Sequence, residues 1–376
     1  MAEGGPVSET DRRLMGAALR LGRRHLGGTF PNPAVGALIV QGEGAAARVV
    51  GRGWTARGGR PHAETEALAE AGGNARDGTV YVTLEPCSHF GATPPCANAL
   101  VRAGVRRVVS AMSDPDPRVA GKGHAVLRQA GISVSVGVLE REARLAHAGH
   151  IARVVTGRPH VTLKLAVSQD GMIGRRGGER VIVSGPAALD RAQAMRAEAD
   201  AVLIGIGTAL ADDPLLTVRL PGMAARSPIR VVLDRRIQLP LGSRLLATAR
   251  DVPLWVVVDA ASAPASRASL VERGATLIEA PGAGGGLDLA AVLSALGAKG
   301  ITRVLVEGGA GIAASLIAEN LVDEVVLFRS TTRIGQGGVP ALAGRDLTAI
   351  EGSRSYRLTG DTPVGGDRMR NYAKAV

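Results

Sequence analysis

Pro61-His62-Ala63-Glu64 and, further along the chain, Glu85-Pro86-Cys87 and Cys96 are the stretches that decide the fold of the first half. His62, Cys87 and Cys96 offer one imidazole and two thiols, one ligand fewer than a closed structural zinc site needs. Glu64 follows the histidine by two residues and can stand beside a metal without binding it. The pattern therefore predicts a catalytic zinc site whose fourth position is open to water.

The chain contains only two cysteines, and both belong to this pattern. A cysteine can also be a small buried hydrophobic residue or half of a disulfide. Neither alternative explains the upstream His-x-Glu. The N-terminal MAEGGPVSETDRR lacks the apolar stretch of a secretory signal, so we expect a cytoplasmic protein, in which a disulfide is unlikely. Zinc-dependent nucleobase deaminases use a similar His-x-Glu…Pro-Cys…Cys pattern. Their short form has two residues between the cysteines, whereas residues 88–95 lie between Cys87 and Cys96.

Length and composition limit the class of protein. A chain of 376 residues predicts two domains, and 45% hydrophobic with only 2% aromatic residues is typical of an α/β core. No apolar run is long enough for a membrane span. The net charge of +11 raises the alternative of nucleic-acid binding. The arginines are scattered and few aromatics are present to stack bases, so we expect small phosphorylated ligands and no nucleic acid.

The first half alternates apolar runs with amphipathic segments, which indicates an α/β domain. A helix is predicted over His62–Ala71, with His62 and Glu64 at its N-terminal turn, and a strand over Thr79–Leu84 that delivers Cys87. Cys96 begins a predicted helix over Pro95–Ala103, where the positive end of the helix dipole would favour thiolate. The other expected elements are a helix over Asp11–Arg24, strands over Val35–Val40, Arg48–Trp54, Arg107–Ala111 and Ser133–Leu139, and a helix from Lys122.

The domain boundary is predicted at Gly157-Arg158-Pro159, after a polar helical stretch, which gives domains over 1–148 and 158–376. A second α/β segment follows. The Gly-rich run 281–286 is interpreted as a flexible linker. Expected strands are His160–Ser168, Ala201–Ile206, Ile229–Asp234, Leu254–Asp259, Ala275–Glu279, Arg303–Glu307 and Glu324–Ser330, and expected helices include Gly185–Ala199, Leu287–Leu296 and Ile312–Asn320.

Two strand exits in the second half are rich in small residues. Glu307-Gly308-Gly309-Ala310-Gly311 precedes a helix, where backbone N–H groups can approach a phosphate, although a tight turn alone explains such glycines equally well. Gly205-Ile206-Gly207-Thr208 is a similar exit. Lys164 lies inside an apolar strand, where a lysine is costly unless it is paired or useful. Together these features indicate a nucleotide cofactor or a phosphorylated ligand, without identifying it.

The motifs of both halves resemble the bifunctional deaminase–reductases of riboflavin biosynthesis, in the same domain order over nearly the whole chain. The wider spacing between the cysteines is typical of that family. The motifs are Pro31-Asn32-Pro33-Ala34-Val35-Gly36, Pro61-His62-Ala63-Glu64, Glu85–Cys96, Lys164–Gly171, Asp212-Asp213-Pro214-Leu215-Leu216-Thr217-Val218-Arg219 and Val306-Glu307-Gly308-Gly309.

The resemblance implies a cytidine-deaminase-like three-layer domain followed by a dihydrofolate-reductase-like domain, in a chain that self-associates. The first would remove the 2-amino group of 2,5-diamino-6-ribosylamino-4(3H)-pyrimidinone 5′-phosphate. The second would use NADPH to reduce the ribosyl group of the product, 5-amino-6-(5-phosphoribosylamino)uracil, to ribityl. His62, Cys87 and Cys96 would hold one zinc ion, and Glu64 would carry protons between water, the ring and the departing ammonia.

The resemblance also implies roles for other residues. Lys164 would orient or polarise the group that is reduced. The expected NADPH contacts are Ala166, Thr208, Asp212, Gly309, Ala310, Gly311, Ile312, Ala313, Ala314 and Ser315, and the expected substrate contacts are Asn32, His89, Arg196, Leu216, Arg219 and Glu307.

Some positions differ from the pattern that the resemblance leads us to expect. These positions are Thr55, Ala92, Asp116, Gln193 and Ile182. They could alter contacts to the substrate and to the nicotinamide, but none of them is a predicted zinc ligand. Three alternatives remain: a nucleic-acid deaminase, which would need a dense basic strand or helix beside the zinc; a structural zinc module with a sensor domain, which Glu64 argues against; and a chain that has lost one of the two activities.

Overall fold

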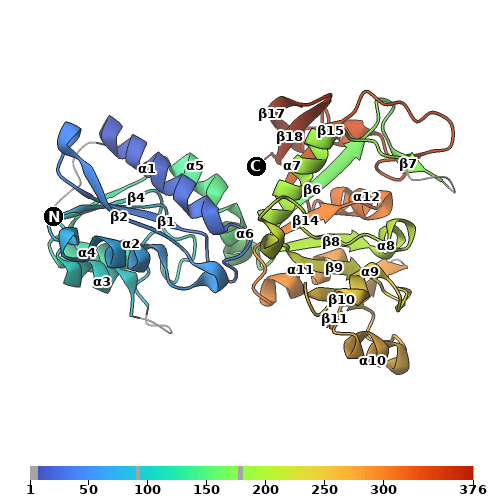
Figure 1. Cartoon of the computed structure of the whole chain (residues 1–376), viewed down its shortest axis with the longest axis horizontal. Helices are drawn as coiled ribbons and strands as arrows, with labels where there is room; N and C mark the ends of the chain where they lie inside the picture. Colours follow the sequence, from blue (N-terminus) through green and yellow to red (C-terminus); the bar gives the residue numbers. More distant parts are fainter. Residues whose placement is uncertain (1–6, 90–93, 177–180, 284, 376) are drawn as a thin grey trace. The chain divides into compact units, whose positions relative to one another are not determined.

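The computed structural model describes residues 7–89, 94–176, 181–283 and 285–375. The chain forms two compact units, Met1–Gly157 and Arg158–Val376, each with its own sheet (Figure 1). Ala92 and part of the motif between the cysteines lie outside the described residues.

A five-stranded sheet in the order β2-β1-β3-β4-β5 forms the centre of the first unit. β1 is antiparallel to both of its neighbours, whereas β3, β4 and β5 are parallel. Helices α1 and α5 lie on one face and α2, α3 and α4 on the other, which gives three layers (Figure 1). The elements are α1 (Glu9–Gly22), β1 (Gly36–Gln41), β2 (Arg48–Trp54), α2 (Ala63–Ala71), β3 (Thr79–Val82), α3 (Cys96–Ala103), β4 (Arg107–Ser110), α4 (Lys122–Gln129), β5 (Ser133–Val136), α5 (Glu140–Ala146) and α6 (Ala148–Thr156).

The predicted helices and strands of this unit agree with the structure to within a few residues at their ends. Ser8 begins α1 with a reciprocal capping box in which Asp11 bonds back to the Ser8 N–H. Glycine on β2 brings α2 close to the sheet, because a Cβ at Gly53 would lie 1.9 Å from the Ala63 carbonyl oxygen. Since His62 and Ala63 open α2, this close approach fixes the start of the helix that carries the metal-site residues.

The second unit contains a nine-stranded sheet in the order β11-β10-β9-β8-β14-β6-β15-β18-β17. The strands from β11 to β15 are parallel, and the C-terminal hairpin β17–β18 continues the sheet in antiparallel fashion. The strands are β6 (His160–Val167), β8 (Ala201–Gly205), β9 (Ile229–Leu233), β10 (Leu254–Val258), β11 (Thr276–Glu279), β14 (Arg303–Glu307), β15 (Glu324–Arg329), β17 (Tyr356–Val364) and β18 (Asp367–Lys374), with helices α7 (Pro186–Ala197), α8 (Ile206–Asp212), α9 (Arg244–Ala247), α10 (Pro264–Glu272), α11 (Leu289–Ala298) and α12 (Ala310–Ala318).

The parallel strands of this unit were all predicted from their apolar residues. β8 and β9 are buried on both faces, whereas β6 alternates between buried and half-buried residues and β11 is partly exposed. The hairpin β17–β18 was not predicted. Most of the β17 side chains are exposed, so its sequence has no apolar alternation. The interpretation of 281–286 as a flexible linker is wrong: β12 (Gly282–Ala283) and β13 (Gly286–Leu287) pair as a short antiparallel hairpin. A second small sheet pairs β7 (Met172–Arg175) with β16 (Gly338–Pro340).

Among the described residues, no helix combines the length and the apolarity that a membrane span requires.

Candidate active sites

Three predicted metal ligands meet at the start of two helices in the first unit. His62 caps α2, Cys87 follows β3, and Cys96 is the first residue of α3. Their ligand atoms all lie within 4.8 Å of one another. His62 Nδ1 is 3.7 Å from Cys87 Sγ and 3.4 Å from Cys96 Sγ. A tetrahedral zinc with usual bond lengths places nitrogen and sulfur ligands about 3.5 Å apart, so these residues fit the ion.

The protonation of the two thiols also indicates a site made for a cation. Hydrogen bonding from Cys96 and from the His62 ring outweighs burial and lowers the pKa of Cys87 to about 4. The hydrogen bond to Cys87, burial and the nearby Glu64 charge raise the pKa of Cys96 instead, because only one of the two thiols is ionised when no cation is bound. Two adjacent thiolates are costly unless a divalent cation compensates their charge.

Glu64 stands in the first turn of α2, beside the three ligands, and is 4% exposed. Burial, followed by the negative charge of Cys87, raises the pKa of the Glu64 carboxyl to about 7. A carboxyl group that titrates near neutrality can both accept and return a proton. The geometry and the charge of the site therefore suit a proton carrier next to a metal.

Neighbouring loops hold the predicted substrate contacts of the first unit. The Asn32 side-chain amide donates to the Gly59 carbonyl oxygen at 2.8 Å, which orients it. Thr55 is buried and ties the same loop, since its hydroxyl donates to Pro33 O at 2.9 Å and accepts from Val35 N at 3.0 Å. His89 is exposed. Both carboxylate oxygens of Asp116 accept hydrogen bonds from the Arg118 guanidinium.

Glu85 has a positioning role that sequence reasoning did not assign. Its buried carboxylate accepts hydrogen bonds from the backbone N–H groups of Asp114, Gly121 and Gly123 at 3.1, 2.9 and 2.8 Å. These hydrogen bonds hold the segment after β4 against Glu85, which lies two positions before Cys87. The only signal in the sequence was an acidic residue at the end of a buried strand.

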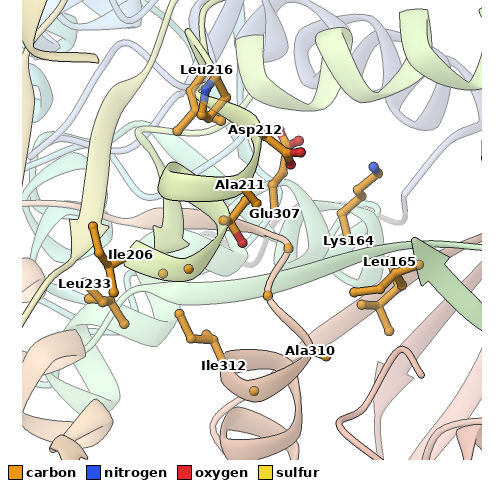
Figure 2. Close-up of a pocket in the computed structure, with 18 of the residues that line it drawn as sticks. Lys164, Leu165, Ile206, Ala211, Asp212, Leu216, Leu233, Glu307, Ala310 and Ile312 are labelled. Carbon is orange, nitrogen blue, oxygen red and sulfur yellow. The ribbon is translucent and has the colours of Figure 1, made fainter. Parts of the chain in front are cut away.

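The second unit contains a cleft of about 1480 Å³ along the carboxyl ends of its parallel strands. Figure 2 shows residues from several strands and helices around this cleft, with Lys164 on one side and Ile206 and Leu233 on the other. Most of the residues predicted for the reductase line it: Lys164, Ala166, Arg196, Thr208, Asp212, Leu216, Arg219, Glu307, Gly309, Ala310, Gly311, Ile312 and Ser315. Ala313 and Ala314 do not; they are buried on the inner face of α12.

Three charged side chains gather at one end of the cleft. Lys164 on β6 is in register with Glu307 on β14. Arg196 binds both carboxylate oxygens of Glu307, at 2.5 and 2.9 Å. Burial lowers the pKa of Lys164 despite the Glu307 charge, whereas Arg196 outweighs burial and keeps the pKa of Glu307 low. The cluster combines one fixed ion pair with a lysine whose proton is more easily released.

Glycines form the turn between β14 and α12. Gly308 and Gly309 have φ of 93° and 84°, a conformation that L side chains rarely adopt. A Cβ at Gly309 would lie 3.3 Å from Thr208 Oγ1 on α8, so the turn and α8 approach closely. Backbone N–H groups at the start of α12 are thus accessible to a phosphate. This turn and the size of the cleft fit a dinucleotide.

Two residues of this unit, Gln193 and Ile182, differ from the family pattern, and they lie in different environments. Gln193 is buried and accepts from the Arg219 backbone N–H at 2.9 Å, so it supports a predicted substrate contact. Ile182 is 70% exposed. Sequence reasoning also missed Arg235 and Arg236, which follow β9 and line the cleft. Their position at a parallel-strand exit was the signal that could have identified them.

Comparisons with known proteins agree with both sites. Residues 8–112 match the cytidine and deoxycytidylate deaminase zinc-binding region, and residues 159–362 match the RibD C-terminal domain. The riboflavin biosynthesis protein RibD of Aquifex aeolicus is 38% identical over 96% of this chain and 98% of its own length. RibD of Escherichia coli is 39% identical over 90% and 93%. A structure of Acinetobacter baumannii RibD is 35% identical with a TM-score of 0.86, covering 98% of this chain and 99% of the other.

The fold and the sites define a bifunctional enzyme, in which a zinc-binding deaminase domain is joined to an NADPH-dependent reductase domain. The chain belongs to the RibD family of riboflavin biosynthesis. The predicted fold class, both enzyme classes and both cofactors are therefore confirmed.

Proposed function

We propose that the chain catalyses two consecutive reactions on a phosphorylated pyrimidine. The first is hydrolytic removal of the 2-amino group of 2,5-diamino-6-ribosylamino-4(3H)-pyrimidinone 5′-phosphate. The second is reduction of the ribosyl group of 5-amino-6-(5-phosphoribosylamino)uracil to ribityl. A Thermotoga maritima protein of known structure, 30% identical with a TM-score of 0.82, is a diaminohydroxyphosphoribosylaminopyrimidine deaminase and 5-amino-6-(5-phosphoribosylamino)uracil reductase. The observation that carries the proposal is Glu64 beside His62, Cys87 and Cys96.

In the deaminase, His62, Cys87 and Cys96 hold zinc, whose contribution is to activate water for hydrolysis. Glu64 takes a proton from the water and delivers protons to the ring nitrogen and the departing amine, so that water and the amidine carbon give a carbonyl and ammonia. Burial raises the pKa of the Glu64 carboxyl, which favours its uptake of a proton from the water. Asn32, held by Gly59, and His89 contact the substrate.

In the reductase, NADPH supplies the hydride. Lys164 and Glu307 face the reacting end of the cleft, where Lys164 polarises or protonates the sugar group that accepts the hydride. Arg196, Leu216, Arg219 and Glu307 hold the substrate, and the two guanidinium groups suit its phosphate. Ala166, Thr208, Asp212 and the 309–315 segment contact the cofactor.

We further infer that the enzyme is cytoplasmic, assembles as a homo-oligomer and does not act on nucleic acid. Many of its arginines are already paired within the chain, including Arg52 with Glu70 and Arg107 with Asp11, which supports the last point. Light scattering of the purified protein tests the assembly, and a gel-shift titration with single-stranded RNA and DNA tests nucleic-acid binding.

A coupled assay tests the proposed pair of reactions. Purified zinc-loaded protein receives the diaminopyrimidinone phosphate, with and without NADPH, while ammonia release and NADPH oxidation are followed separately. Ammonia should appear without NADPH, and NADPH should be oxidised only when the deaminated product is present. Ammonia without NADPH oxidation would refute the reductase assignment, and the absence of both signals would refute the proposal.

A further inference from the structure

Arg230 is an arginine inside the apolar core of the reductase unit. It lies on β9, in register with Val202 of β8 and Leu254 of β10, and its side chain is 0% exposed. Val202, Leu254 and Val232, which is two positions further along β9, belong to one buried apolar cluster that also contains Leu216. A charged side chain loses its hydration in such a place, so we expect contacts that compensate this cost.

Within the described part of the chain, the hydrogen bonds of the Arg230 guanidinium go to uncharged oxygens. Nη1 donates to Thr248 Oγ1 at 2.7 Å and to Leu215 O at 3.4 Å. Nη2 donates to Thr248 O at 3.0 Å and to Val252 O. Burial lowers the pKa of Arg230 to about 10, so the guanidinium remains protonated at neutral pH. The buried cation thus joins the turn after α9 to the segment that follows α8.

The segment that follows α8, residues 213–219, belongs to no helix or strand. Leu216 and Arg219 of this segment line the cleft, and Figure 2 shows Leu216 among the side chains around it. Asp213 and Leu216 have φ of 38° and 56°, the left-handed region that residues other than glycine rarely adopt. Because no helix or strand hydrogen bonds hold this backbone, its conformation depends on side chains from elsewhere in the unit.

Two arginines hold the backbone on either side of the left-handed Leu216. Arg230 donates to the carbonyl oxygen of Leu215, directly before it, and Arg196 donates to the carbonyl oxygen of Thr217, directly after it, at 3.0 Å. Arg196 itself lines the cleft, whereas Arg230 is fully buried and does not. Arg230 can therefore affect a substrate in the cleft only through the segment that it holds.

We propose that Arg230 is a positioning residue for the reductase, which holds the 213–219 segment so that Leu216 and Arg219 meet the substrate. Its planar, fork-shaped guanidinium reaches Leu215 O and the turn after α9 at the same time, whereas a lysine ammonium offers a single point of charge. The proposed role rests on the reduction proposed for this cleft. It adds a residue that acts on substrate binding without lining the cleft.

Steady-state kinetics of the full chain with NADPH and 5-amino-6-(5-phosphoribosylamino)uracil test this role. Arg230→Met should raise KM for the uracil by about 10- to 100-fold, the usual effect of losing a charged hydrogen bond, and change kcat by less than about 3-fold. Arg230→Lys keeps the charge, so it should raise KM less, and it carries the test if Arg230→Met does not fold.

Leu270→Ala is the matched control for a general loss of stability. Leu270 lies on α10, outside the cleft, and is fully buried in the same apolar cluster. Its truncation should lower the unfolding midpoint and leave KM within about 3-fold. Hydrogen exchange of peptides that cover 213–219 reports the segment directly. Exchange there should be faster in the Arg230 variants than in wild type and unchanged in Leu270→Ala.

The outcomes separate the role of Arg230 from the proposed reductase. Unaltered KM and exchange in the Arg230 variants, in a protein that still oxidises NADPH, would overturn the positioning role and leave the reductase intact. An equal rise of KM in Leu270→Ala would also overturn it, because general destabilisation would then explain the effect. A wild-type protein that does not oxidise NADPH with this substrate would refute the reductase and the positioning role together.

Discussion

The two sites of this chain are built in opposite ways. The zinc site takes His62, Cys87 and Cys96 from a short stretch of sequence, gathers their ligand atoms within 4.8 Å of one another and adds the buried Glu64 beside them. The reductase cleft takes residues from 164 to 339 and spreads them along the ends of several parallel strands. The first site concentrates charge on one ion, whereas the second distributes contacts along an extended cofactor. Substitution of one residue should therefore reduce activity severely at the zinc site and by graded amounts in the reductase cleft.

Removal of one zinc ligand should have the largest effect. Cys96→Ser leaves two ligands, so we expect zinc content to fall from one per chain to near zero and ammonia release to fall to background. Metal analysis and the ammonia assay measure this. NADPH binding by the second unit is the internal control and should persist. Full zinc content in Cys96→Ser would show that the ion is held elsewhere.

Lys164→Met tests the reacting end of the cleft. Loss of a group that polarises or protonates the substrate should lower kcat of the reduction by about 10²- to 10³-fold while ammonia release is unchanged. The matched control is Lys299→Met, because Lys299 is exposed and lies 5.8 Å from the Trp255 ring centroid, away from the cleft. An unaltered kcat in Lys164→Met would exclude this role for the lysine.

Gly309→Val tests the phosphate-binding turn of the same cleft. The positive φ and the close approach to Thr208 do not accommodate a branched side chain, so the turn must shift. NADPH binding should weaken by about 10- to 100-fold, measured by fluorescence titration, with little change in zinc content. Gly344→Val shares the positive φ but lies outside the cleft, and a similar loss of binding there would point to general strain.

Asp11→Asn should have the smallest effect, confined to the stability of the first unit. Burial opposes ionisation of Asp11, but hydrogen bonds from Arg107, the Ser8 N–H and Tyr81 outweigh it and lower its pKa. Its stabilisation is therefore complete above the unfolded-state pKa of 3.8 and is lost as pH falls through the lower folded-state value.

At pH 7, Asp11→Asn should destabilise the first unit by roughly 1–3 kcal/mol, and the difference from wild type should shrink below pH 4. Denaturant unfolding of both proteins at several pH values measures this. Asp323→Asn, which breaks the pair with Arg158, provides the same test in the second unit. A difference that persists unchanged at pH 2.5 would contradict the assigned cause.

The contrast between the sites also explains what the sequence could predict. The zinc ligands were identified because metal binding demands few residue types, and the chain has no other cysteine with which to confuse Cys87 and Cys96. The parallel strands were identified from their apolar runs. The hairpin β17–β18 was missed because backbone hydrogen bonds hold its two strands together and the mostly exposed side chains of β17 leave no apolar pattern.

The residues of the reductase cleft were harder to predict from the sequence. Its residues come together only through the order of strands in the sheet, which spacing along the chain does not encode. Lys164 was noticed because a lysine in a buried strand is unusual, but its partner Glu307 is 143 positions away and in register only through β6–β14 pairing. Arg235, Arg236 and the 282–287 hairpin were missed because arginines and glycines after a strand are common.

Mixing two single-site variants tests the central claim, that one chain carries two chemically separate sites. Glu64→Gln should lose deamination by about 10³-fold and retain zinc and reduction of added deaminated product, while Lys164→Met should show the reverse pattern. Incubated together with the diaminopyrimidinone phosphate and NADPH, the two should restore formation of the ribityl product that neither makes alone. Loss of both activities in Glu64→Gln, or a mixture that stays inactive although each variant retains its other activity, would contradict the claim.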